Sequence, residues 1–225
     1  MFGIIILFVI AGFVVQQRLK SKFKKYSQES LSNGMSGAEI AQKMLDDHGI
    51  YDVRIESVAG KLTDHYNPAN KTVNLSPEVY SGRSVAAAAV AAHEVGHAVQ
   101  HAQSYKWLEM RSQLVPMVQF SGKIMNIVIW SMILGVGFLG IFGYNTAIWV
   151  LIAAQMAITG FAVVTLPVEY DASNRALAWL TTSGLVTTEE HDKANDALSW
   201  AARTYLVAAL ASMAQLAYYF SLLRD

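Results

Sequence analysis

The chain has 225 residues, of which 53% are hydrophobic and 15% charged, and its mean hydropathy is +0.30. This balance is more apolar than that of a soluble domain and indicates a membrane protein. The net charge is zero and no basic patch is interleaved with aromatic residues, which excludes nucleic acid as a partner. The absence of cysteine excludes disulfides and a thiolate metal site.

The first apolar stretch, residues 1–17, is uncharged and is followed by five basic residues between Arg18 and Lys25. A cleaved signal peptide has the reverse order, so we expect a retained transmembrane anchor with its N-terminus outside. Because the apolar core is short, a helix lying on the lipid surface is the alternative.

Two further apolar stretches predict three more spans. Residues 124–168 carry no charge. This stretch is long enough for two spans, 124–142 and 146–167, joined by a turn at Gly143-Tyr144-Asn145. Residues 204–223 are again uncharged and predict a last span. The positive-inside rule orients these spans, because 16 of the 17 Lys and Arg residues fall in the two polar segments between them. Both polar segments are therefore expected in the cytosol.

The first polar segment begins with a predicted helix. Ser36-Gly37-Ala38-Glu39 has the pattern of a capping box at a helix start, and Gly49 is a stop signal. Val53 and Ile55 alternate with polar residues, which predicts a half-buried strand.

A hairpin or wide turn and a long helix follow in the same segment. Residues 61–66 and 72–75 flank the turn residues 67–70. Ser76-Pro77-Glu78 then predicts a short helical turn. An alanine-rich run predicts a helix from about Arg83 to Ala102.

His93-Glu94-Val95-Gly96-His97 lies near the end of this helix. Histidines four residues apart lie on one helical face and can bind one zinc ion at about 2.0–2.1 Å. Glu94 is displaced around the helix, where it can reach a water on the metal. The pattern is HExxH, in which the glutamate is the general base of a zinc hydrolase. The alternative is a core helix with two hydrogen-bonded histidines.

Catalytic zinc takes three protein ligands and an open position for water. His101 would lie about 12 Å from His93 along the helix, so it is not expected to bind the same ion. Glu169 directly follows an apolar stretch, and the hairpin returns it to the side of the motif helix. We therefore expect Glu169 to be the third ligand, with Asp171 as a less favoured candidate. A solvated charge opening a helix is the alternative for Glu169.

A strand beside the motif helix can offer backbone groups to an extended peptide substrate, and we nominate Thr72-Val73-Asn74-Leu75 for this role. An ordinary strand that binds nothing is the alternative. Among the histidines outside the motif, His65 is the best candidate for contacting substrate or an oxyanion.

The residues HEVGHAVQ from His93 and EYDASNRA from Glu169 resemble the YugP-type neutral zinc metallopeptidases of bacterial membranes. The resemblance covers essentially the whole chain, including Thr63-Asp64-His65-Tyr66-Asn67-Pro68. These proteins are similar in plan to the HtpX and Ste24 membrane proteases, which are gluzincins with a glutamate as third ligand. The resemblance implies Zn²⁺ on His93, His97 and Glu169, with Glu94 as the base.

One position departs from the HtpX-type pattern, which has an aspartate four residues after the ligand glutamate that supports a zinc histidine. Ser173 stands there in this chain. Asp171, Ser173 and Asn174 are therefore all candidates for orienting a ligating imidazole. Arg175 is a candidate for a substrate or oxyanion contact, or for an ion pair in the first turn of its helix.

The expected fold is mainly α: an integral membrane protein with about four transmembrane helices and a small α+β zincin-like domain of the gluzincin type. The expected parts are the anchor 1–17, a cytosolic domain 18–123, a transmembrane hairpin 124–167, a cytosolic segment 168–203, and a C-terminal helix and tail 204–225.

The expected function is a zinc endopeptidase of the bacterial inner membrane that cleaves peptides or membrane proteins at the cytosolic bilayer surface. A regulatory membrane partner or an oligomer is left open. The main alternative is a non-proteolytic membrane scaffold with a structural or vestigial metal site. A metal transporter is disfavoured because none of the expected spans carries a charged or histidine residue.

Overall fold

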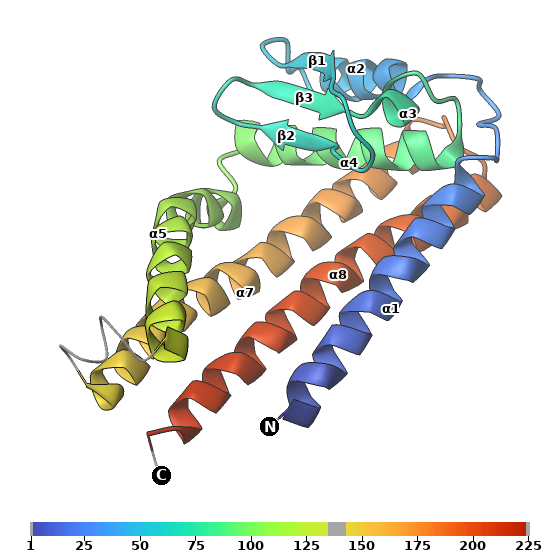
Figure 1. Ribbon diagram of the computed structural model, residues 1–225. Coiled ribbons are helices and arrows are strands. Elements are labelled where there is room, and N and C mark those ends of the chain that lie inside the picture. Colours follow the sequence, from blue (N-terminus) through green and yellow to red (C-terminus); the bar gives the residue numbers. More distant parts are fainter. Residues whose placement is uncertain (1, 135–142, 224–225) are drawn as a thin grey trace. The chain divides into compact units, whose positions relative to one another are not determined.

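The computed structural model describes residues 2–134 and 143–223, so part of the expected hairpin, residues 135–142, lies outside the described residues. The described chain is mainly helical and carries one small sheet (Figure 1). Its elements are α1 (Phe2–Tyr26), α2 (Gly37–Asp47), β1 (Arg54–Ser57), β2 (His65–Asn67), β3 (Thr72–Leu75), α3 (Pro77–Tyr80), α4 (Val85–Ala102), α5 (Lys106–Leu134), α7 (Tyr144–Thr182) and α8 (Thr188–Ser221).

The chain divides into two compact units. The sheet-containing unit comprises residues 14–108 and 167–204, and the helical unit comprises residues 1–13, 109–166 and 205–225. The sheet, α2, α3 and α4 all belong to the sheet-containing unit, and so does the C-terminal part of α7.

The sheet has the strand order β1-β3-β2. Strands β2 and β3 pair antiparallel around the turn at residues 68–71, so the expected hairpin is confirmed. Strand β1 pairs parallel with the other side of β3. Thr72–Leu75 therefore lies in the centre of the sheet with both edges paired, and its nomination as a substrate-binding edge was wrong. The edge strand beside α4 is β2.

Helices α2 and α4 form the core of the sheet-containing unit. The expected capping box begins α2, because Ser36 accepts from the N–H of Glu39 while Glu39 accepts from the N–H of Ser36. Ile40, Met44 and Leu45 are fully buried on the side that packs on α4. The alanine-rich start of α4 has small side chains, so α2 and the sheet can both pack closely against it.

Two helices among the described residues are long and apolar enough to cross a membrane, α5 and α7, rather than the four that we expected. The N-terminal stretch is not among the two, and α1 ends in basic residues, with Lys24 and Lys25 in its last turn. The C-terminal stretch fails because polar residues such as Gln215 and Ser212 dilute its apolar ones. The four-span prediction is corrected to two candidate spans.

Helix α7 is continuous from Tyr144 to Thr182 and contains Pro167. The alternative, in which Glu169 is a solvated charge that opens a helix, is therefore wrong. Proline costs the helix one backbone hydrogen bond without ending it here. Glu169 consequently lies in the interior of a long helix.

Candidate metal centre

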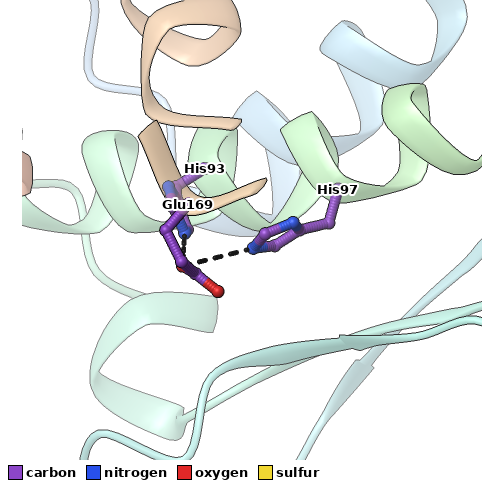
Figure 2. A group of neighbouring side chains, drawn as sticks. All are labelled: His93, His97 and Glu169. Atoms are coloured by element: carbon purple, nitrogen blue, oxygen red, sulfur yellow. Dashed lines mark ion pairs between the residues drawn. The ribbon is translucent and has the colours of Figure 1, made fainter. Parts of the chain in front are cut away.

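Two helices of the sheet-containing unit bring three ligand-type side chains together. Helix α4 presents His93 and His97 one turn apart, and α7 directs Glu169 towards them (Figure 2). Glu169 Oε2 lies 3.3 Å from His93 Nε2 and 3.6 Å from His97 Nε2. The three ligand atoms all lie within 4.8 Å of one another, and the carboxylate is 2% exposed.

These separations match what a zinc ion requires. Ligand atoms at the corners of a tetrahedron with bonds of about 2.0–2.1 Å lie about 3.3–3.4 Å apart. The two Glu169–histidine separations, 3.3 and 3.6 Å, are close to that spacing. Two imidazoles and one carboxylate are also a usual donor set of catalytic zinc. The group could therefore hold a metal ion.

Gly96 allows α7 to approach α4 this closely. A Cβ atom at Gly96 would lie 2.6 Å from the backbone oxygen of Ala172, well inside van der Waals contact. Residue 96 lies between the two histidines of the motif, and residue 172 lies one turn beyond Glu169. The missing side chain at position 96 thus sets the distance between the backbone that carries the histidines and the backbone that carries the carboxylate.

Glu94 is buried beside this group, with 8% of its surface exposed. Burial raises its pKa above the ordinary value, against the opposing effect of the two histidines. Its Oε2 accepts a hydrogen bond of 2.9 Å from the backbone N–H of Tyr66 on β2. Burial alone would lower the pKa of His97. The carboxylates of Glu169 and Glu94 have the opposite and larger effect, so the pKa of His97 lies above its ordinary value.

Each histidine has a separate partner for the ring nitrogen that faces away from Glu169. His93 Nδ1 lies 3.1 Å from the hydroxyl of Ser173, a position that the sequence pattern singled out. His97 Nδ1 lies 3.0 Å from Oε1 of Gln100, which is fully buried. Gln100 in turn donates from Nε2 to a carboxylate oxygen of Asp171 and to the backbone oxygen of Val168, both at 2.8 Å.

Asp171 therefore reaches His97 through Gln100 and not directly. Sequence reasoning missed Gln100, although its position three residues after His97 on the same helix was a usable signal. Outer partners of this kind fix the tautomer and orientation of ligating imidazoles.

The remaining candidates lie away from the three ligand-type groups. Asn174 is exposed, and His65 is exposed with its Nδ1 2.8 Å from the backbone oxygen of Thr63. Arg175 donates to Asp171 at 2.5 Å and to Gln103 at 2.6 Å, which is the ion-pair alternative. His101 Nδ1 lies 2.7 Å from the hydroxyl of Tyr66, so it makes a polar contact outside the cluster.

Two imidazoles and a carboxylate that could hold one metal ion are a donor set found in zinc metallopeptidases. The family described as "Putative neutral zinc metallopeptidase" matches residues 1–224, and the chain belongs to that family. A relative from Bacillus subtilis (strain 168), named "Putative membrane protease YugP", is 43% identical over 210 residues. The match covers 91% of this chain and 88% of the relative. The family resemblance is thus confirmed. No solved structure matches the chain significantly, and the zincin-like fold stays a prediction.

Proposed function

We propose that this protein is a zinc-dependent endopeptidase that cleaves peptide bonds of membrane-associated proteins. One observation carries the proposal: His93, His97 and Glu169 offer three ligand atoms within 4.8 Å of one another, with the buried carboxylate of Glu94 beside them. A purely structural metal site would not need that fourth group. Membership of the zinc metallopeptidase family supports the same chemistry.

In the proposed reaction, His93 and His97 would hold zinc through Nε2 and Glu169 through its carboxylate. Bound zinc would supply an activated water and a Lewis acid for the scissile carbonyl. Glu94 accepts a proton from the attacking water and passes it to the leaving amine.

Replacing Glu94 with Gln tests this proposal. The amide keeps the size of the side chain but cannot accept the proton, so hydrolysis of dye-labelled casein is expected to fall about 10²- to 10⁴-fold. Zinc content should stay near one ion per chain. Glu56→Gln, on the exposed part of β1, is the matched control and should keep wild-type activity. Wild-type rates in zinc-loaded Glu94→Gln would refute the proposal, as would a purified protein that binds no metal.

We also propose that the metal centre faces the cytosol of a bacterial cell and that α5 and α7 form a transmembrane hairpin. The residues between Lys123 and Glu169 carry no charge, while basic residues flank both ends of this stretch at Lys106, Arg111, Lys123 and Arg175. Such an asymmetry orients hairpins with the basic side inward. The relative from B. subtilis is named a membrane protease, which fits this setting.

The absence of native cysteine makes the orientation easy to test. Tyr51 is 81% exposed in the sheet-containing unit, and Tyr144 is 50% exposed at the start of α7. In intact cells a membrane-impermeant maleimide should label Tyr144→Cys and should label Tyr51→Cys only after permeabilisation. Labelling of Tyr51→Cys in intact cells would overturn the cytosolic assignment without affecting the zinc chemistry.

A further inference from the structure

The segment Asp64-His65-Tyr66 precedes the motif helix in sequence, yet Tyr66 contacts that helix at two places. Strand β2 is one of the two edge strands, and among the described residues it pairs with β3 alone. The backbone N–H of Tyr66 points away from β3 and donates to Glu94 Oε2 at 2.9 Å. The main chain of the edge strand therefore holds one oxygen of the side chain that we assign as the catalytic base.

The side chain of Tyr66 makes the second contact. Its hydroxyl lies 2.7 Å from Nδ1 of His101, and the two rings are 5.8 Å apart at a tilt of 54°. Burial raises the pKa of Tyr66 to about 12, so the phenol stays protonated at neutral pH. When the imidazole is neutral, the hydroxyl is the donor and Nδ1 the acceptor, and the remaining imidazole proton is on Nε2.

Glu94 and His101 are seven residues apart on α4, which is two helical turns or about 10.5 Å. Tyr66 connects these two positions through its N–H at one end and its hydroxyl at the other. Asp64 secures the start of the same strand, because its carboxylate accepts from the N–H of Ser76 at 2.7 Å and from the Ser76 hydroxyl at 3.2 Å. Tyr66 thus holds β2 against α4, and Asp64 ties the start of the strand to the start of α3.

We propose that Tyr66 is a positioning residue, held by His101, whose main-chain N–H fixes one carboxylate oxygen of Glu94 and leaves the other to meet the attacking water. The proposal rests on the proposed function of Glu94. A carboxylate held by one donor has one orientation in place of several, and misplacing a catalytic group by about 1 Å can cost about 100-fold in rate. The hydroxyl of Tyr66 acts at a distance, by preventing β2 from moving away from α4.

Two single substitutions and their combination test the proposal on the full chain, with dye-labelled casein as substrate. Tyr66→Phe and His101→Ala should each lower kcat about tenfold, with KM and zinc content unchanged. The double variant should fall no further than either single variant, because both remove the same hydrogen bond. His101→Asn should recover wild-type kcat within about twofold, because its amide oxygen can stand where Nδ1 stands. Tyr51→Phe is the matched control and should have no effect.

Hydrogen exchange gives a second readout that needs no substrate. In Tyr66→Phe and His101→Ala, exchange of the amide at position 66 should accelerate about tenfold, while amides of β1 and β3 keep their wild-type rates. A purely structural role would instead accelerate exchange across the whole sheet and lower the melting temperature.

Three results would overturn the proposal: wild-type kcat in both single variants, multiplicative losses in the double variant, or a rise in KM at constant kcat. The last result would place Tyr66 in substrate binding. Failure of the proposed function is recognised separately, because Glu94→Gln would then be as active as the wild type. If Glu94→Gln is inactive while Tyr66→Phe keeps full kcat, only the positioning role fails.

Discussion

Replacing Gly96 with alanine should disrupt the metal centre without touching any ligand. The added Cβ would lie 2.6 Å from the backbone oxygen of Ala172, and ordinary contact begins at 3.4 Å, so α4 and α7 must separate by about 0.8 Å (3.4 − 2.6). Zinc–ligand distances tolerate only about 0.2 Å. The separation moves Glu169 relative to both histidines, because it lies less than one turn before Ala172 on the same helix.

The expected result for Gly96→Ala is a loss of zinc affinity of about 10- to 100-fold, measured by competition with a chromophoric chelator, and a parallel loss of proteolysis. Helix α4 itself should not be weakened, because alanine is a better helix former than glycine by about 1 kcal/mol. Gly160→Ala, in the interior of α7, is the matched control, because a Cβ there would meet nothing within 4 Å. Unchanged zinc affinity and activity in Gly96→Ala would refute the view that this helix contact sets the site geometry.

Three further predictions follow from the same structure. Gln100→Leu and Ser173→Ala should each reduce zinc affinity about 10- to 100-fold, and unchanged chelator titrations for both would show that these partners do not orient the histidines. Treatment with EDTA should abolish casein hydrolysis, and added zinc should restore it. Glu190 tests electrostatics away from the site: burial raises its pKa, but the N–H groups of Thr187 and Ser32 hold it below the ordinary 4.5. The folded state therefore favours the ionised form, and its stabilisation is present above about pH 4.5 and is lost as the pH falls through the lowered folded-state value. Glu190→Gln should lower the free energy of unfolding at pH 7 by about 1–2 kcal/mol and by much less at pH 2, as measured by denaturant titration.

The local features of the fold could be predicted from the sequence because each depends on neighbouring residues. The capping box at Ser36, the helix that ends at Ala102 and the hairpin around residues 67–70 all formed as expected. The order of the strands could not be predicted. Strand β1 pairs with β3, which is not its neighbour in sequence, and this pairing makes β3 the central strand. Local alternation does not distinguish a central strand from an edge strand when both are short.

The candidate site shows the same division. The spacing of His93 and His97 follows from helix geometry, and the return of Glu169 follows from the length of the uncharged stretch. Ser173 was a candidate from the sequence, whereas the role of Gln100 depends on α7, because its amide is held by Val168 and Asp171 of that helix. The role of Tyr66 was also missed, because its contact with Glu94 is made by the backbone N–H, which every residue except proline has.

The continuity of α7 through Pro167 changes how the proposed third ligand, Glu169, is held. At a helix start, the alternative considered from the sequence, Glu169 would lie on backbone that frays and has unpaired N–H groups. In the interior of α7 its backbone is fixed on both sides, and only the side-chain rotamer remains variable. All three ligand-type groups thus lie on rigid helices that meet at Gly96 and Ala172, and none lies on a loop. A site built this way is already ordered before a metal ion binds, so binding the ion costs little conformational entropy.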